Sequence, residues 1–191
     1  MKGKKVGVLA LQGDYAAHVA ALREAGAEAF EIRSGTDLEA ADAVVIPGGE
    51  STVMGMLLQR FGFLDAFRER ILAGMPVFGT CAGVILLAKD IENRDQPGLG
   101  VLDASVRRNA YGTQIDSFRT VLETAVPGVG VIEGVFIRAP KIIAVGPAVE
   151  VLARSGGDPV LVRQGNILGA TFHPELVPGA LIHKWFLGFI A

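Results

Sequence analysis

The stretch Val77-Phe78-Gly79-Thr80-Cys81-Ala82-Gly83 joins a β-rich run to a helical segment through a turn flanked by glycines. Gly-x-Cys-x-Gly is the nucleophile-elbow pattern with cysteine in place of serine. The glycines leave room for a sharp strand-to-helix turn that holds Cys81 in a strained backbone conformation. The N–H groups that begin the next helix would favour a thiolate, and the Ala82 N–H would face an oxyanion. A small buried hydrophobic side chain is the competing interpretation of this cysteine.

The sequence around this turn alternates between strand-like and helical segments. Residues 6–10, 29–32, 43–46 and 77–78 are short apolar runs and are predicted strands. Residues 15–25, 51–61, 64–73 and 82–89 are predicted helices. Strands and helices that alternate with short links are typical of an α/β fold with a mostly parallel central sheet flanked by helices.

The second half of the chain has a different pattern. Turn signals separate short strand-like runs at 101–106, 117–122, 131–137, 142–145, 149–152, 160–163 and 167–171. These runs predict extra short antiparallel strands, and residues 178–189 predict a closing helix with an apolar stripe. The sequence contains no recognisable linker or repeat, so we expect a single domain over residues 1–191.

The composition excludes several classes of protein. Half of the residues are hydrophobic and 20% are charged, so wholesale disorder is excluded. The formal net charge of −2 favours neither nucleic acid nor a membrane as a partner. The single cysteine cannot form an intrachain disulfide, and no stretch approaches the roughly 20 apolar residues that span a bilayer. We therefore expect a cytoplasmic location.

A nucleophilic cysteine needs a base, and the chain has three histidines. His173 follows the predicted strand 167–171, where a side chain projects toward the crevice at the carboxyl edge of a parallel sheet. Glu175 is two residues further, and alternation in an extended segment would place both side chains on one side. The carboxylate could then accept a hydrogen bond from His173. A surface His-Pro turn is the alternative, and His18 and His183 are expected to be solvated or partly packed.

The segment Pro47-Gly48-Gly49-Glu50-Ser51 follows the predicted strand 43–46 and precedes a helix. Its two glycines would let backbone N–H groups approach a ligand closely. The spacing of a phosphate-binding P-loop is absent, and no G-x-G-x-x-G dinucleotide motif occurs in the chain. An ordinary strand-to-helix turn is the alternative.

Together, the cysteine elbow and the later His173-Pro174-Glu175 resemble the class I (triad) glutamine amidotransferases, which have a flavodoxin-like three-layer fold. Further segments resemble the glutaminase subunits of pyridoxal 5′-phosphate synthase, and this resemblance covers essentially the whole chain. These segments are Leu11-Gln12-Gly13-Asp14, Pro47-Gly48-Gly49-Glu50-Ser51-Thr52, Arg108-Asn109-Ala110-Tyr111-Gly112, Gln114 with Asp116-Ser117-Phe118, and Phe136-Ile137-Arg138-Ala139-Pro140.

The resemblance implies that the protein hydrolyses L-glutamine to L-glutamate and ammonia. It implies that Cys81 is the nucleophile, that His173 shuttles the proton and that Glu175 orients His173. The implied L-glutamine contacts are Gly48, Gly49, Glu50, Arg108, Ile137 and Arg138, with the Gly49 and Ala82 N–H groups as oxyanion donors. Neither a metal nor a cofactor is expected.

The resemblance also implies a partner, a separate synthase subunit with a (β/α)8 barrel that uses the ammonia to build pyridoxal 5′-phosphate. A barrel of roughly 200 residues or more does not fit in this chain, so its product cofactor is not expected to bind here. One departure is Thr113, where relatives often have arginine. A glutaminase subunit of another ammonia-using synthase and a non-catalytic scaffold of the same fold are the alternative functions.

Overall fold

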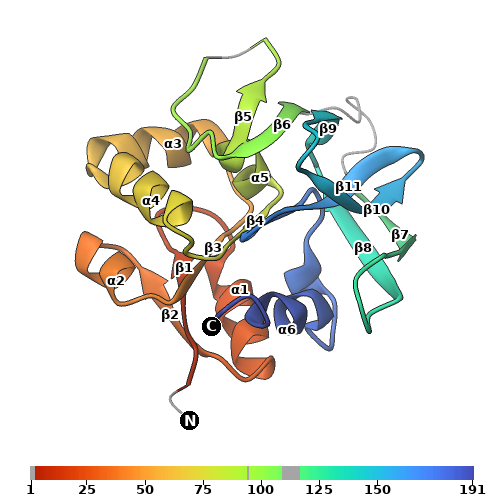
Figure 1. The fold of residues 1–191 in the computed structure, drawn as a ribbon, viewed down its shortest axis with the longest axis horizontal. Coiled ribbons are helices and arrows are strands. Elements are labelled where there is room, and N and C mark those ends of the chain that lie inside the picture. The colour runs from red at the N-terminus through yellow and green to blue at the C-terminus, as the bar shows by residue number, and fades with distance from the viewer. Residues whose placement is uncertain (1–2, 94, 109–116) are drawn as a thin grey trace.

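The computed structural model describes residues 3–93, 95–108 and 117–191, and a seven-stranded sheet runs through its centre (Figure 1). The strand order is β10-β11-β12-β4-β3-β1-β2. Five neighbouring strands are parallel, and their order β2-β1-β3-β4-β12 is that of flavodoxin-like sheets. The prediction of a mostly parallel central sheet is therefore confirmed. These strands are β1 (Lys5–Leu9), β2 (Glu28–Ile32), β3 (Ala43–Ile46), β4 (Val77–Thr80) and β12 (Ile167–Ala170).

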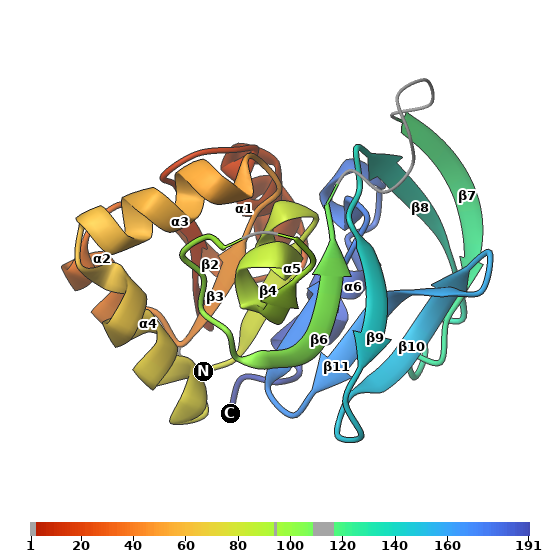
Figure 2. The same ribbon diagram turned by 90° about the horizontal axis from the view of Figure 1, so that it is seen from above.

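Helices cover both faces of this sheet (Figures 1 and 2). One face carries α1 (Tyr15–Glu24) and α6 (Leu181–Leu187), and the other carries α3 (Ser51–Arg60), α4 (Phe63–Leu72) and α5 (Ala82–Leu87). Strand β3 contributes side chains to both cores, because Val44 and Ile46 pack on one side and Ala43 and Val45 on the other. An uninterrupted apolar run is typical of such a doubly covered strand. Within the described ranges, no helix is both long and apolar enough to cross a membrane.

The second half of the chain supplies the additional antiparallel strands. β10 (Glu150–Ser155) and β11 (Asp158–Gln164) extend the main sheet, and β7 (Ser117–Glu123) pairs with β8 (Val131–Ile137) as a hairpin. A further sheet contains β5 (Ala88–Ile91), β6 (Leu102–Arg107) and β9 (Lys141–Val145), in which β6 and β9 are antiparallel. The expected antiparallel additions are confirmed, although β5 pairs with β6 in parallel.

The sequence pattern did not reveal one short helix, and the predicted bounds of two others were wrong. The short helix α2 (Gly35–Glu39) was not predicted, although Ser34 and Asp37 form a capping box at its start. Helix α5 ends at Leu87 rather than at 89, because the following residues pair with β6. The last helix begins at Leu181 rather than at 178, because Gly179 and Ala180 have φ of 92° and 48°.

The close packing of α5 on β3 predicts the effect of Gly83→Ala. A Cβ atom on Gly83 would overlap the backbone carbonyl oxygen of Ile46, which lies in a fully buried strand. We expect the variant to lose about 1–3 kcal/mol of unfolding free energy in urea titrations, as overpacked sites do. Gly35→Ala is the matched control, because its Cβ would lie 3.8 Å from the Phe63 ring and meet ordinary contact. Equal stability of the Gly83 variant and the wild type would contradict this packing.

Candidate active site

Cys81 lies at the carboxyl edge of the sheet, between β4 and α5. Its φ of 49° and ψ of −107° are unusual for a residue with a side chain, which agrees with the strain expected of an elbow. The Cys81 N–H donates to the carbonyl oxygen of Ala170 at 2.8 Å, and the sulfur lies 3.8 Å from the Ile137 carbonyl oxygen. A Cβ on Gly79 would lie 2.8 Å from Gly83 backbone atoms, so the turn needs its glycine.

His173 lies beyond the end of β12, the strand next to β4 in the sheet. Its N–H donates to the Val135 carbonyl oxygen at 2.8 Å, and its Nδ1 lies 2.7 Å from Oε1 of Glu175. The predicted contact between His173 and Glu175 is therefore present, but alternation in an extended segment is not its cause. Pro174–Leu176 forms a 3-10 turn, η1, that folds Glu175 back toward the imidazole.

His173 and Cys81 line one cavity of about 340 Å³. Burial opposes a positive charge on His173, but the interaction with Cys81 and the hydrogen bond to Glu175 outweigh it and raise the pKa of His173 to about 10. At neutral pH the imidazole therefore carries a proton that it can give to a reacting group. The cavity is lined by Gln12, Gly49, Glu50, Ser51, Cys81, Ala82, Ile85, Arg108, Ile137, Arg138 and His173.

The Gly48–Gly49 segment packs tightly against both halves of the site. A Cβ on Gly48 would lie 2.6 Å from Cε1 of His173 and 3.3 Å from Cβ of Cys81. The Gly48 carbonyl oxygen is packed against the Cα atom of Gly13, and Gly49 has a φ of 156°. Because the peptide is trans, the Gly49 N–H points away from Gly13. Space therefore requires a glycine at both positions, and at Gly49 the backbone conformation requires it as well.

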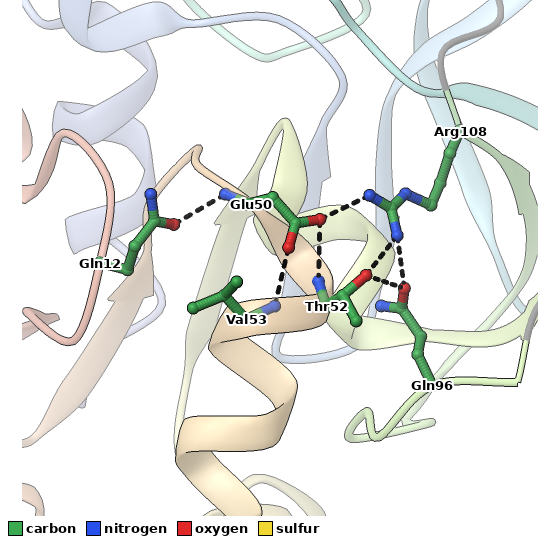
Figure 3. Close-up of polar contacts among 6 residues, drawn as sticks. All are labelled: Gln12, Glu50, Thr52, Val53, Gln96 and Arg108. Carbon is green, nitrogen blue, oxygen red and sulfur yellow. Dashed lines mark hydrogen bonds and ion pairs between the residues drawn. The ribbon is translucent and has the colours of Figure 1, made fainter.

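Glu50 and Arg108 meet at the side of the cavity (Figure 3). The Glu50 carboxylate accepts hydrogen bonds from the N–H groups of Thr52 and Val53 at the start of α3 and from Arg108 Nη2 at 2.6 Å. Burial acts against ionisation of Glu50, but these hydrogen bonds and the Arg108 charge prevail and lower its pKa. The Arg108 side chain is 17% exposed, so this arginine is not a freely solvated charge at the end of a strand.

Two glutamines that we had not assigned to the site complete this arrangement (Figure 3). Gln12 Oε1 accepts from the Glu50 N–H at 2.7 Å, and Gln96 Oε1 accepts from Arg108 Nη1 at 2.8 Å. Gln12 lies in a segment quoted for the family resemblance, which was the one available signal. Gln96 carries no recognisable motif, because its role depends on the tertiary contact that brings it to Arg108 at the far end of β6.

The prediction for the other two histidines was wrong. His18 and His183 have no solvent exposure, although both were expected to be solvated or partly packed. They lie on facing helices, α1 and α6, and His18 Nδ1 is 3.0 Å from His183 Nε2. The residues next to His18 are apolar, whereas the charged Lys184 follows His183, and both histidines are buried where two helices that are far apart in the chain meet.

Other predicted positions have mixed outcomes. Ile137 and Arg138 both line the cavity, and Arg138 has a φ of 43°. Residues 109–116, which include the quoted Tyr111, Gln114 and Thr113, lie outside the described residues. Ala82 lines the cavity as the first residue of α5, where a helix has free N–H groups.

A flavodoxin-like sheet with a cysteine elbow beside a His–Glu pair has the architecture of the class I glutamine amidotransferases. A model of the SNO glutamine amidotransferase family matches residues 8–190, and the chain belongs to this family.

Two curated relatives and one solved structure are similar to this chain over nearly its whole length. "Pyridoxal 5'-phosphate synthase subunit PdxT" of Mycolicibacterium vanbaalenii is 51% identical over 197 residues, covering 100% of both chains. The protein of the same name from Thermus thermophilus is 52% identical over 184 residues, covering 95% of each chain. A solved structure described as a glutamine amidotransferase superposes with a TM-score of 0.92 at 50% identity, covering 97% of this chain and 98% of the other.

The buried histidines predict how stability changes with pH. Burial lowers the pKa of His183 to about 4 and lowers that of His18 well below 6.5, so the unfolded chain binds protons that the folded chain does not. The free energy of unfolding should therefore fall as pH decreases from 6.5 to 4, by about 3 kcal/mol for His183, with a further loss from His18. His173 has a raised pKa and changes stability only above pH 6.5, up to about 10.

Urea titrations at several pH values measure this slope. His183→Gln removes one titrating group while keeping an N–H donor in place, so its slope between pH 6.5 and 4 should be smaller. A wild-type protein whose stability is constant across this range would contradict the buried neutral state of these histidines.

Proposed function

We propose that the protein hydrolyses L-glutamine to L-glutamate and ammonia with Cys81, His173 and Glu175. One observation carries this proposal. Cys81, which has a φ of 49°, lines the same cavity as His173, and His173 is hydrogen-bonded to the buried carboxylate of Glu175. Membership of a glutamine amidotransferase family supports the choice of substrate. The names of the two curated relatives support a role as the glutaminase subunit of pyridoxal 5′-phosphate synthase.

The first half of the reaction forms a covalent intermediate. The Cys81 thiolate attacks the side-chain amide carbon of glutamine, and the carbonyl oxygen becomes an oxyanion that the N–H groups of Gly49 and Ala82 stabilise. His173, which is protonated at neutral pH, gives its proton to the amide nitrogen as the carbon–nitrogen bond breaks. Ammonia leaves, and a glutamyl thioester with a neutral His173 remains.

The second half returns the enzyme to its starting state. His173 accepts a proton from a water molecule, which adds to the thioester carbon. The carbon–sulfur bond then breaks, and glutamate leaves while Cys81 is again a thiolate beside a protonated His173. Glu175 keeps the imidazole oriented through both steps by accepting the hydrogen bond of Nδ1 at 2.7 Å.

Free glutamine is a zwitterion, and the Glu50–Arg108 pair offers one charge of each sign at the cavity. Arg108 would bind the α-carboxylate, and Glu50 would face the α-ammonium group. Gly48, Gly49, Ile137 and Arg138 would form the remaining substrate contacts. Hydrogen bonds keep this pair in place before substrate arrives. The backbone N–H groups of Thr52 and Val53 donate to Glu50, and the side-chain oxygen of Gln96 accepts from Arg108.

The names of these relatives, as subunits of a synthase, support a proposal about the setting in which the protein works. The ammonia would pass to a separate (β/α)8-barrel subunit in a hetero-oligomer, where pyridoxal 5′-phosphate is built. We also propose that residues 1–191 form a single domain and that the protein works in the cytoplasm, which its lone cysteine suits.

The two alternative functions have less support. A glutaminase subunit of another synthase would have the same site. However, the two relatives at about 50% identity are both named as subunits of pyridoxal 5′-phosphate synthase, which favours that synthase. A non-catalytic scaffold would not need a strained cysteine beside a histidine that is hydrogen-bonded to a glutamate. Co-purification with the cognate synthase, followed by assays of glutamine hydrolysis with and without it, tests the proposed function.

Cys81→Ala should abolish glutamine hydrolysis and leave synthesis from added ammonium salt intact in the complex, because only the ammonia source is lost. His173→Asn should be comparably severe, whereas Glu175→Gln should retain more activity, because an orienting residue is partly replaceable. Release of glutamate and formation of pyridoxal 5′-phosphate are measured in parallel. Hydrolysis near the wild-type rate in the Cys81 variant would mean that another residue is the nucleophile.

Arg108→Met should raise KM for glutamine about tenfold or more, because a charged hydrogen bond to the α-carboxylate is lost. Arg107→Met is the matched control, because Arg107 is the adjacent arginine, its side chain is 49% exposed and it pairs with Glu92 instead. The control should keep the wild-type KM. Equal KM values for both variants would argue against Arg108 as a substrate contact.

A further inference from the structure

A chain of buried polar side chains lies behind the proposed triad. Nε2 of His18 is 3.2 Å from Oε2 of Glu175 and 3.0 Å from Oγ1 of Thr80, while Nδ1 of His18 is 3.0 Å from Nε2 of His183. The side chains of His18 and Glu175 are 0% exposed, so water does not compete for these contacts. Thr80 is adjacent to Cys81 in the sequence, so His18 contacts a neighbour of the nucleophile as well as the carboxylate.

The carboxylate determines where the protons of this chain lie. Oε2 of Glu175 has no hydrogen-bond partner among the described residues, and Nε2 of His18 lies 3.2 Å from it. A proton on Nε2 of His18 can be shared between Oε2 of Glu175 and Oγ1 of Thr80, whereas a bare Nε2 would turn a lone pair toward the carboxylate, so we assign the proton to Nε2. Nδ1 of His18 is then an acceptor, and His183 must donate from its own Nε2.

The remaining atoms fit this assignment. Nδ1 of His183 has no hydrogen-bond partner among the described residues, as expected of the unprotonated nitrogen at the end of the chain. A proton on that atom would leave a buried donor unsatisfied, which costs about 1–3 kcal/mol. Burial and the neighbouring histidines also lower the pKa of His18, so it stays neutral and keeps one protonated nitrogen.

We propose that His18 is a positioning residue for the glutaminase reaction, which holds Oε2 of Glu175 through an Nε2–H donor that His183 orients. Each oxygen of the carboxylate is then occupied by one imidazole, His173 on Oε1 and His18 on Oε2. This prevents the carboxylate from rotating and fixes the direction in which His173 presents its other nitrogen to Cys81. The proposal rests on the proposed roles of Cys81, His173 and Glu175.

Two substitutions of His18 separate positioning from packing. His18→Leu removes the donor and keeps an apolar side chain, so kcat for glutamine should fall about 10–100-fold while KM changes little. His18→Gln places an amide N–H where Nε2 was, so it should recover most of the lost kcat. Thr171→Val is the matched control, because Thr171 is also fully buried, its hydroxyl has no partner among the described residues, and it should keep wild-type kcat.

A second readout is the pH profile of Cys81 alkylation by iodoacetamide. Without the contact to His18, the Glu175 carboxylate can rotate away from Nδ1 of His173, so protonated His173 loses its aligned acceptor and alkylation of His18→Leu should need a higher pH than that of the wild type. A folded His18→Leu variant with wild-type kcat and pH profile would overturn the proposal. So would equal impairment of the Leu and Gln variants with an unchanged profile, because that result indicates packing alone.

The wild-type protein provides a test that does not depend on a variant folding. Two-bond ¹H–¹⁵N spectra identify which nitrogen of a neutral histidine carries the proton. We expect Nε2–H for both His18 and His183, and an Nδ1–H tautomer for His18 would overturn the proposal. Failure of the proposed function would give a different result from failure of the His18 proposal, because glutamine hydrolysis would then persist in Cys81→Ala.

Discussion

The pairing of β4 with β12 is the contact on which the candidate site depends. Thr80 is aligned with Ala170, and the N–H of Cys81 extends the ladder by donating to the Ala170 carbonyl oxygen. One strand therefore ends at the cysteine and its neighbour leads into His173. Because parallel strands end at the same edge, two residues that are far apart in the sequence line one cavity. The strain at Cys81 persists because buried strands on both sides fix the turn.

Burial couples this edge of the sheet to the helices on one face. His18 on α1 and His183 on α6 have no exposure, and Glu175 lies between His18 and His173. Buried polar groups are costly unless they are hydrogen-bonded, so each contact constrains the next. On the other side of the cavity, the ion pair of Glu50 and Arg108 is held by the start of α3 and by Gln96. Hydrogen-bonded side chains therefore hold the residues on both sides of the cavity in place.

The sequence predicted the parts that depend on local pattern. The apolar run at 43–46 coincides with β3, and the glycines around Cys81 predicted a strained turn, where the structure has a φ of 49°. Contacts between distant segments were not predictable in this way. The burial of His18 depends on how α1 packs against α6, and Gln96 reaches Arg108 only through the tertiary contact at the far end of β6. The 3-10 turn at Pro174–Leu176 also differs from the extended geometry that a period-two reading of His173 and Glu175 assumed.

We propose above that Cys81 is a nucleophile that His173 activates in a glutamine-binding cavity. Mass spectrometry after incubation with a diazo-ketone analogue of glutamine, in the presence of the cognate synthase, tests it most directly. We expect one covalent adduct per chain, on Cys81, that excess glutamine suppresses and that forms much more slowly in His173→Asn. An unmodified Cys81, or labelling that glutamine does not suppress, would contradict it.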